Sequence, residues 1–174
     1  MYELPFGTGR SFFTHEPRVI NGLIDGWQVN GILTFDTGTP LIMTGAVNET
    51  GIFTDSDQPE NNGHSANVPN PTISRWFNTS VFSQPAPFTL GNTSRTLPNV
   101  RNPGYNNADL SLFKNDYFGK EDRYNLQVRI EAYKALNNPN WGAPNTNITA
   151  GPAEGTITSD EGPRNVQLAL KFLF

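Results

Sequence analysis

The feature that most constrains this chain is a strict two-residue alternation near its end. In residues 165–174 (NVQLALKFLF) every even position is apolar, whereas Gln167 and Lys171 lie among the odd positions. Residues 124–132 (YNLQVRIEA) repeat the pattern, with polar or charged side chains at the odd positions. Because successive side chains of a strand point to opposite faces of a sheet, both segments are predicted to be strands with one apolar face.

Weaker alternation predicts two further strands, over residues 27–37 and 107–115. The two clearer strands are predicted to cover residues 124–135 and 165–174 and to be neighbours in one sheet. The link between 115 and 124 is too short for a crossover helix, so neighbouring strands are expected to run antiparallel. The sequence therefore predicts an all-β fold, arranged as an antiparallel meander.

Two architectures fit strands of this kind. In a soluble β-sandwich the apolar face packs against a second sheet and the polar face meets water. In an outer-membrane barrel the apolar face meets lipid and the polar face lines the lumen. The two clearer strands reach the roughly 9–11 residues that a membrane strand needs. Alternation alone leaves both architectures open.

Residues 46–105 show little periodicity and are predicted to form one long loop. Long regular elements are excluded there because proline recurs at positions 59, 69, 71, 85, 87, 98 and 103. A loop of this length in a compact domain is either functional or a sign of a wrong assignment. A barrel accommodates it, because the extracellular loops of a barrel are long and its periplasmic turns are short.

Composition excludes several classes of protein. The chain has 174 residues, a net charge of −4 and no cysteine. Without a basic excess it is not expected to bind nucleic acid, and without cysteine it forms neither disulfides nor thiolate metal sites. Its first residues lack the charged and apolar regions of a signal peptide. We therefore expect the sequence to be a fragment of a longer exported protein.

No arrangement of residues indicates catalysis or a bound cofactor. There is no G-x-S-x-G motif, P-loop or G-x-G-x-x-G fingerprint, and the two histidines, His15 and His64, lie in different segments. The chain is therefore predicted not to be an enzyme. Asp55, Asp57 and Glu60 are a weak calcium candidate, because their oxygens have a usable spacing. They lack the glycine and glutamate of an EF-hand loop, and a solvated acidic loop is the alternative.

Aromatic residues gather in two kinds of place. Trp76, Phe77, Tyr105 and Trp141 lie in or at the ends of the long links, where flat rings can stack on a sugar or pin a link onto itself. They are the candidate ligand-binding residues. A second group, typical of either an interfacial aromatic girdle or a sheet core, flanks the short turn and the end of the last strand: Tyr117, Phe118, Tyr124, Phe172 and Phe174.

A set of short motifs, taken in order along the chain, resembles a known family. The motifs are YELPFGTGR (2–10), GWQVNGI (26–32), WFN (76–78), NADLSLFKN (107–115), YNLQVRIEA (124–132), LNNPNWGAP (136–144) and LALKFLF (168–174). Together they resemble the C-terminal end of a TonB-dependent outer-membrane receptor, of the Oar-like type found in acidobacteria. No single motif is specific, but the ordered set spans nearly the whole chain.

The resemblance implies that residues 1–174 are the last strands of a large transmembrane β-barrel, with long extracellular loops and without the plug domain. The implied function is transport in the bacterial outer membrane, as wall and loops of a receptor for an unidentified ligand, with a glycan as the candidate. The implied partners are outer-membrane lipid, the remaining barrel and plug, and the outer-membrane assembly machinery. Phe174 would belong to the signal that this machinery reads.

The alternative is a soluble β-sandwich from a truncated reading frame, either a carbohydrate-binding module or a carbohydrate-active enzyme. A piece of a barrel has two unpaired edges, so a stable soluble form has to hide them by curling, strand swapping or oligomerising. Solubility of the purified chain without detergent distinguishes the two interpretations.

Overall fold

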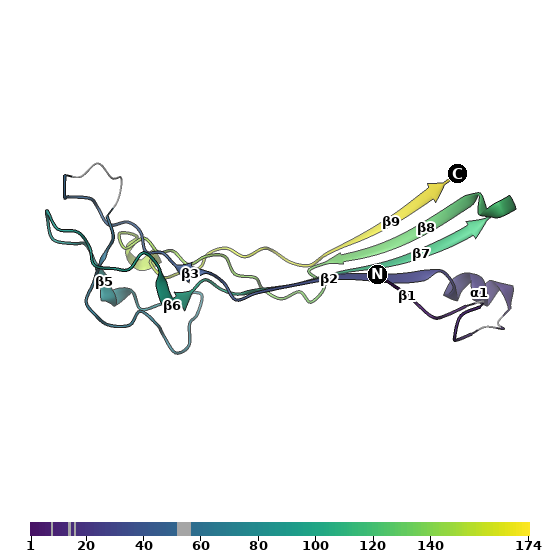
Figure 1. The fold of residues 1–174 in the computed structure, drawn as a ribbon, viewed down its shortest axis with the longest axis horizontal. Helices are drawn as coiled ribbons and strands as arrows, with labels where there is room; N and C mark the ends of the chain where they lie inside the picture. The colour runs from purple at the N-terminus through teal and green to yellow at the C-terminus, as the bar shows by residue number, and fades with distance from the viewer. Residues whose placement is uncertain (8, 14, 16, 52–56) are drawn as a thin grey trace. The chain divides into compact units, whose positions relative to one another are not determined.

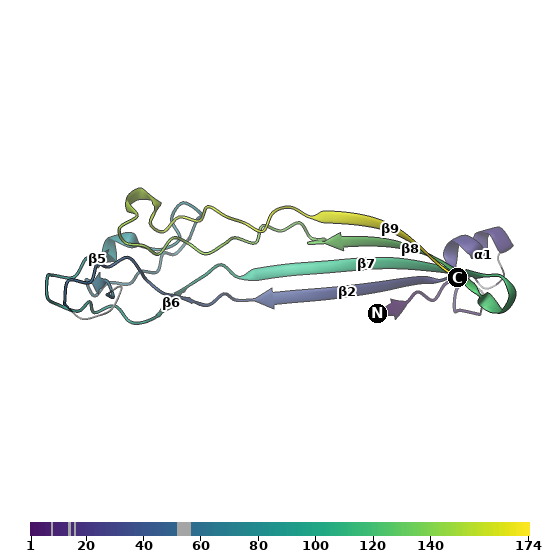
Figure 2. The same ribbon diagram turned by 90° about the horizontal axis from the view of Figure 1, so that it is seen from above.

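The computed structural model describes residues 1–7, 9–13, 15, 17–51 and 57–174. Within these residues, five strands form one sheet in the order β1-β2-β7-β8-β9, in which neighbouring strands run in opposite directions (Figures 1 and 2). The strands are β1 (Tyr2–Glu3), β2 (Trp27–Asp36), β7 (Tyr105–Phe118), β8 (Tyr124–Tyr133) and β9 (Asn165–Leu173). The predicted all-β meander is confirmed, including the pairing of the last two strands, and β7 is longer at both ends than predicted.

In its described part, the chain forms two compact units. The sheet unit comprises Met1–Thr34, Asn106–Asn138 and Pro163–Phe174. The loop unit comprises Phe35–Tyr105 and Pro139–Gly162, so it consists almost wholly of the two long links of the sequence.

The pairing register of the last three strands assigns their side chains to two faces. Leu112 of β7 lies opposite Ile130 of β8, which lies opposite Leu168 of β9, and even-numbered residues stay aligned along both pairings. The even-numbered face is mainly apolar, and the described residues leave much of it open, since Leu168 is 75% exposed. This openness differs from a sandwich, in which a second sheet would cover the apolar face.

Two charged residues interrupt the even-numbered face. Lys114 and Asp116 of β7 lie opposite Val128 and Leu126, and they form an ion pair with each other. Pairing offsets part of the cost of placing a charge on an apolar surface, and Lys114 is buried. The same two residues explain why the alternation of β7 is weaker in the sequence than that of its neighbours.

The odd-numbered face is polar and internally hydrogen-bonded. Gln127 donates from its amide nitrogen to Asn115 Oδ1 at 2.8 Å, and Arg129 donates to Glu131 Oε1 at 2.8 Å. The Arg129 guanidinium also lies 4.7 Å from the centre of the Phe113 ring. Apart from the Lys114–Asp116 pair, the sheet therefore has one apolar face and one face suited to water.

A tight turn containing the 3-10 helix η2 (Lys120–Asp122) joins β7 to β8. Beside it, the rings of Phe118, Tyr124 and Phe172 lie with centroids 5.6 to 6.1 Å apart, and Phe174 stacks on Phe172 at 6.0 Å. These four residues are even-numbered, so the aromatic cluster lies on the apolar face at the end of the sheet. The link between β1 and β2, which holds α1 (Arg18–Ile24), lies at this same end (Figure 2).

The loop unit has a hydrophobic core of its own. Its buried members are Leu41, Met43, Ala66, Phe77, Val81, Phe82, Leu97 and Val100, with Trp76 and Ile148 packed against them. Its short elements are β3 (Pro40–Leu41) paired with β6 (Leu97–Arg101), β4 (Glu60–Asn61) paired with β5 (Phe82–Ser83), and the 3-10 helices η1 (Thr79–Val81) and η3 (Gly151–Ala153). Residues 46–105, predicted as one loop, therefore contain paired strands and most of a core.

Backbone hydrogen bonds join the two long links to each other. Ile148 N–H donates to Thr44 O at 3.1 Å, and Ile157 N–H donates to Ile73 O at 2.7 Å. Buried backbone groups need such partners, so the second link completes the hydrogen bonding of the first.

Phe77→Ala is expected to destabilise the loop unit by about 3–5 kcal/mol, because it removes a fully buried ring and leaves a cavity. The matched control is Phe88→Ala, since the Phe88 ring is 84% exposed, and its expected effect is within about 0.5 kcal/mol. Hydrogen exchange of the amides in both long links measures the difference. Equal protection in the two variants would show that this core does not hold the links together.

Candidate functional site

Three adjoining cavities line one side of the loop unit. They have volumes of about 300, 110 and 290 Å³, and they are lined by residues within 42–44, 57–66 and 92–100. The first and second share Asn61 and Leu97, and the first and third share Thr93 and Ser94. Because their linings are continuous, we treat the three as one surface and call it the Thr93 groove.

Uncharged hydrogen-bonding side chains outnumber charged ones in the lining of the Thr93 groove, beside apolar residues such as Met43 and Leu97. The amides and hydroxyls are Thr44, Gln58, Asn61, Ser65, Asn92, Thr93, Ser94 and Asn99. Asp57 and Arg95 add one acidic and one basic group, and His64 lies in the second cavity. Amides offer both donors and acceptors, and hydroxyls do the same, so the groove can bind a ligand that carries both kinds of group.

The groove is held in shape by contacts between two segments distant in sequence. Asn92 Oδ1 accepts from Asn61 N–H at 2.7 Å, and its amide nitrogen donates to Glu60 Oε1 at 2.5 Å. Thr93 N–H donates to Pro59 O at 3.0 Å. A Cβ at Gly91 would overlap the carbonyl oxygen of Gln58, so only glycine permits this close approach of the two backbones.

Two buried polar atoms of the groove have no hydrogen-bond partner among the described residues. One is Thr93 Oγ1, on a residue that is 3% exposed, and the other is Asp57 Oδ2. Both residues line the third cavity. A buried hydroxyl without a partner costs about 1–3 kcal/mol, so a polar group that supplied a partner here would remove that cost.

The four aromatic residues that are candidates for ligand binding have surroundings other than the Thr93 groove. Phe77 is fully buried in the loop core, edge-to-face with Phe82, and the Trp76 indole donates to Arg101 O at 2.7 Å. Tyr105 is the first residue of β7. Trp141 is partly exposed, and its backbone forms an isolated β-bridge with that of Asp160. As far as the described residues go, the lining of the Thr93 groove includes none of the four.

The calcium candidate is only partly within the described residues, because Asp55 lies outside them. Asp57 Oδ1 accepts from Gln58 N–H at 2.6 Å, and Glu60 Oε1 accepts from Asn92. Over the described ranges, no group of three acidic, histidine or cysteine side chains could hold a metal ion. The two carboxylates therefore serve the groove as hydrogen-bond acceptors.

Partial burial raises the pKa of Glu154, the C-cap residue of η3 in the loop unit. The raised pKa means that the surroundings disfavour the charged form of this carboxyl group. Glu154 lines none of the three cavities, so its titration is separate from the chemistry of the Thr93 groove.

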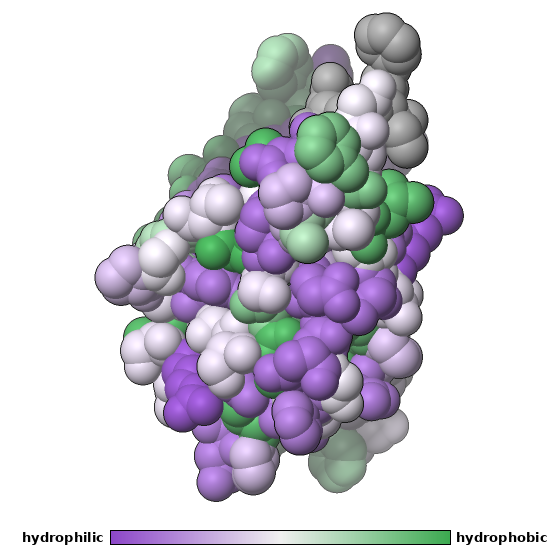
Figure 3. All heavy atoms as spheres, turned by 90° about the vertical axis from the view of Figure 1, so that its left-hand side faces the viewer, coloured by the Kyte–Doolittle hydropathy of each residue, from purple (hydrophilic) through white to green (hydrophobic). Residues whose placement is uncertain are grey.

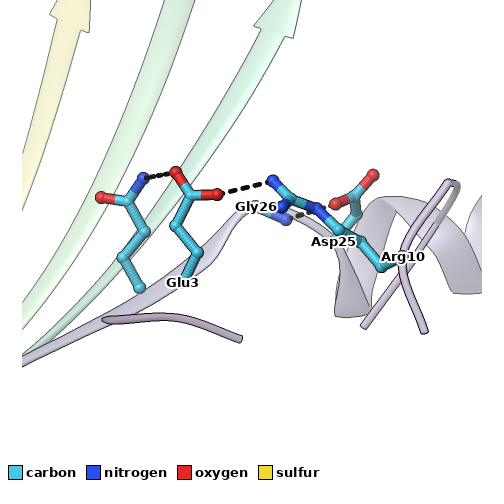
Figure 4. Close-up of polar contacts among 5 residues, drawn as sticks. Glu3, Arg10, Asp25 and Gly26 are labelled. Atoms are coloured by element: carbon cyan, nitrogen blue, oxygen red, sulfur yellow. Dashed lines mark hydrogen bonds and ion pairs between the residues drawn. The ribbon is translucent and has the colours of Figure 1, made fainter. Parts of the chain in front are cut away.

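A second polar cavity, of about 470 Å³, lies within the sheet unit. Arg10 donates to Glu3 Oε2 at 2.8 Å and Gln28 donates to Glu3 Oε1 at 3.3 Å, while Asp25 Oδ1 accepts from Gly26 N–H at 2.7 Å (Figure 4). The charged side chains of this cavity are thus bonded within the protein, which makes the Thr93 groove the stronger candidate for an outside ligand.

The Thr93 groove has little signal in the sequence. Its segments are rich in Asn, Ser and Thr, a composition that is also typical of ordinary solvated loops. The pairing of 57–61 with 91–95 depends on contacts that no local pattern predicts. The face seen in Figure 3 is mainly hydrophilic, with apolar residues scattered over it.

Residues 1–167 match the model of a protein family described as an outer membrane beta barrel domain. The match covers nearly the whole chain and confirms the predicted location in the bacterial outer membrane. Proteins with such a domain are usually not enzymes. No curated protein and no solved structure matches the chain. In the described part of the chain, no helix has the length and apolarity to cross a membrane.

Thr93→Val is expected to raise the stability of the ligand-free loop unit by about 1 kcal/mol, because it removes a buried hydroxyl that lacks a partner. Thr93→Ser keeps the hydroxyl and loses a methyl group, so it is expected to lower stability by a similar amount, about 0.8 kcal/mol. Hydrogen exchange of the amides in residues 92–100 measures both. If Thr93→Val is the more destabilised variant, the hydroxyl is already bonded within the protein.

Proposed function

The chain belongs to the outer membrane beta barrel domain family, and on that premise we propose that it forms wall and extracellular loops of a TonB-dependent receptor that takes up a polyhydroxylated ligand, such as a glycan. The observation that carries the ligand class is the buried, unpartnered hydroxyl of Thr93 in a groove of amides and hydroxyls. The TonB-dependent receptor is suggested by the resemblance of the motifs along the chain.

The topology of the strands supports an outward position for the groove. In outer-membrane barrels the short turns face the periplasm and the long loops face the outside. The β7–β8 turn is short, whereas the β2–β7 and β8–β9 links are long and together form the loop unit. On this assignment, the Thr93 groove lies on the side from which a nutrient arrives.

The chemistry of the groove favours a neutral polyol over a strongly charged ligand. Sugar hydroxyls are donors and acceptors at once, as are the amides of Asn61 and Asn92 and the hydroxyls of Thr93 and Ser94. The third cavity contains one acidic and one basic side chain, Asp57 and Arg95. Because their charges are opposite, the cavity has no net charge that would favour an anion or a cation.

The receptor proposal also requires strands beyond those in the described sheet. Within a bilayer, a β-structure satisfies all its backbone N–H and C=O groups only when it closes into a barrel. In the sheet order of the described residues, β9 has a paired neighbour only in β8, and the two-residue β1 covers a small part of β2. We propose that the remaining barrel strands pair with these edges and that a plug fills the lumen against the polar, odd-numbered face.

Two further parts of the proposal concern catalysis and assembly. The chain supplies binding and passage and no reaction step, so hydrolysis of a sugar ligand that one side-chain substitution abolishes would contradict it. Phe174 acts as an assembly signal, an interpretation that rests on the resemblance. Its 91% exposure supports a role other than packing, because its stacking on Phe172 covers little of the ring.

The test is saturation binding of a panel of neutral gluco-, manno- and xylo-oligosaccharides to the full-length protein in outer-membrane vesicles. Wild-type protein is expected to bind at least one member, and Thr93→Val is expected to weaken that binding about tenfold, equivalent to one lost hydrogen bond. Thr93→Ser, which keeps the hydroxyl, is the matched control and should retain the affinity. Uptake of the bound sugar by cells should stop when a protonophore collapses the inner-membrane gradient.

Two results would contradict the proposal. If no oligosaccharide of the panel binds saturably, the polyol ligand is wrong. If the sugar enters cells at an undiminished rate after the gradient has collapsed, the protein is a passive channel and the TonB-dependent assignment is wrong.

A further inference from the structure

An apolar pocket of about 240 Å³ lies at the short-turn end of the sheet unit. Its lining is hydrocarbon from three segments: Leu4 and Phe6 after β1, Leu23 and Ile24 of α1, and Trp27 and Leu112 of the sheet. A pocket without polar groups has nothing to offer water. The receptor function proposed above does not say what occupies this pocket.

The pocket is continuous with the membrane-facing side of the sheet. Leu112 lies opposite Ile130, and Ile130 lies opposite Leu168 in the even-numbered, apolar row. In an outer-membrane barrel domain this row faces lipid. The pocket therefore opens on the face that hydrocarbon covers, at the level where β2 begins.

Helix α1 contributes residues both to the polar cavity and to the apolar pocket. Asn21 and Gly22 line the polar cavity together with Glu3 and Gln28, whereas Leu23 and Ile24 line the apolar pocket. Val19 and Leu23, four positions apart and thus on one side of the helix, are 77% and 66% exposed. A short helix with one apolar and one polar side is the pattern of a segment that lies in a membrane interface.

The polar group of the Trp27 side chain, which lines the pocket, is bonded within the protein. The Trp27 indole N–H donates to Leu23 O at 2.8 Å, which satisfies its one polar group and ties the strand to the helix. Phe6 packs on Phe12 and Phe13 with ring centroids 6.2 and 6.0 Å apart, and both of these rings are exposed. The exposed apolar surface thus extends from the pocket along the link.

We propose that α1, with Leu4 and Phe6, is an interfacial lipid-binding element whose apolar pocket holds an acyl chain of a phospholipid in the leaflet nearest the short β7–β8 turn. Continuity with the lipid-facing row favours this occupant over a protein segment. The element adds apolar contact with the bilayer at a position where barrels otherwise have only short turns.

The test places a bimane probe on α1 in the full-length protein, reconstituted into phosphatidylethanolamine–phosphatidylglycerol vesicles with brominated acyl chains. The probe at Val19→Cys is expected to be quenched by the bromolipid about threefold more than the probe at Gly22→Cys, because only the first faces the acyl region. Gly22 is a matched control on the same helix, where an added Cβ meets no neighbour within 4 Å. Aqueous iodide should reverse the order.

A second readout tests the pocket itself through bromolipid quenching of Trp27 fluorescence, taken as the difference between the protein with and without Trp27→Phe because the chain also contains Trp76 and Trp141. Leu23→Gln is expected to reduce this quenching about threefold, because an amide disfavours hydrocarbon in the pocket. Leu168→Gln, on the same face but outside the pocket, should leave it unchanged. Equal effects of the two substitutions would contradict the proposal that the pocket holds an acyl chain. A Val19 probe shielded from both quenchers would show that a protein segment covers the helix instead.

Discussion

In the sheet, each residue of β8 from Asn125 to Ala132 has a direct partner in both β7 and β9, so the register decides which environment every side chain meets. A slip by one residue would exchange the two faces completely. It would turn Arg129 and Glu131 towards hydrocarbon and Leu168 towards water. Most other features of the sheet unit, including the aromatic cluster and the apolar pocket, depend on this register, which places even-numbered and odd-numbered residues on opposite faces.

The loop unit is stabilised in a different way. Its core of Leu41, Phe77, Leu97 and their neighbours resembles the core of a small soluble domain, and its two links share backbone hydrogen bonds. It therefore does not need lipid to bury its apolar groups. A preformed core also keeps the Thr93 groove in shape, which on the proposed function reduces the entropy that binding has to overcome.

Strands with clean alternation, β8 and β9, could be predicted from the sequence almost to their ends, because a period of two reports directly on the faces of a sheet. The predicted range of β7 stops at 115 because the charged Asp116 stands where the alternation requires an apolar residue; in the structure it pairs with Lys114. The loop core and the groove could not be predicted, since they join residues such as Gln58 and Gly91 that approach only in the folded chain. Phe77 was a candidate ligand-binding residue from its position alone, and the structure places it in that core.

The central claim is that even-numbered residues of β9 face lipid and odd-numbered residues face the barrel interior. Nitroxide labels placed one at a time along Asn165–Leu173 of the full-length protein in bilayers test it directly. The account predicts that accessibility to oxygen, which concentrates in hydrocarbon, peaks at 166, 168, 170 and 172, while a water-soluble nickel reagent reaches the positions between them. Peaks in the opposite phase, or accessibility without a period of two, would contradict it.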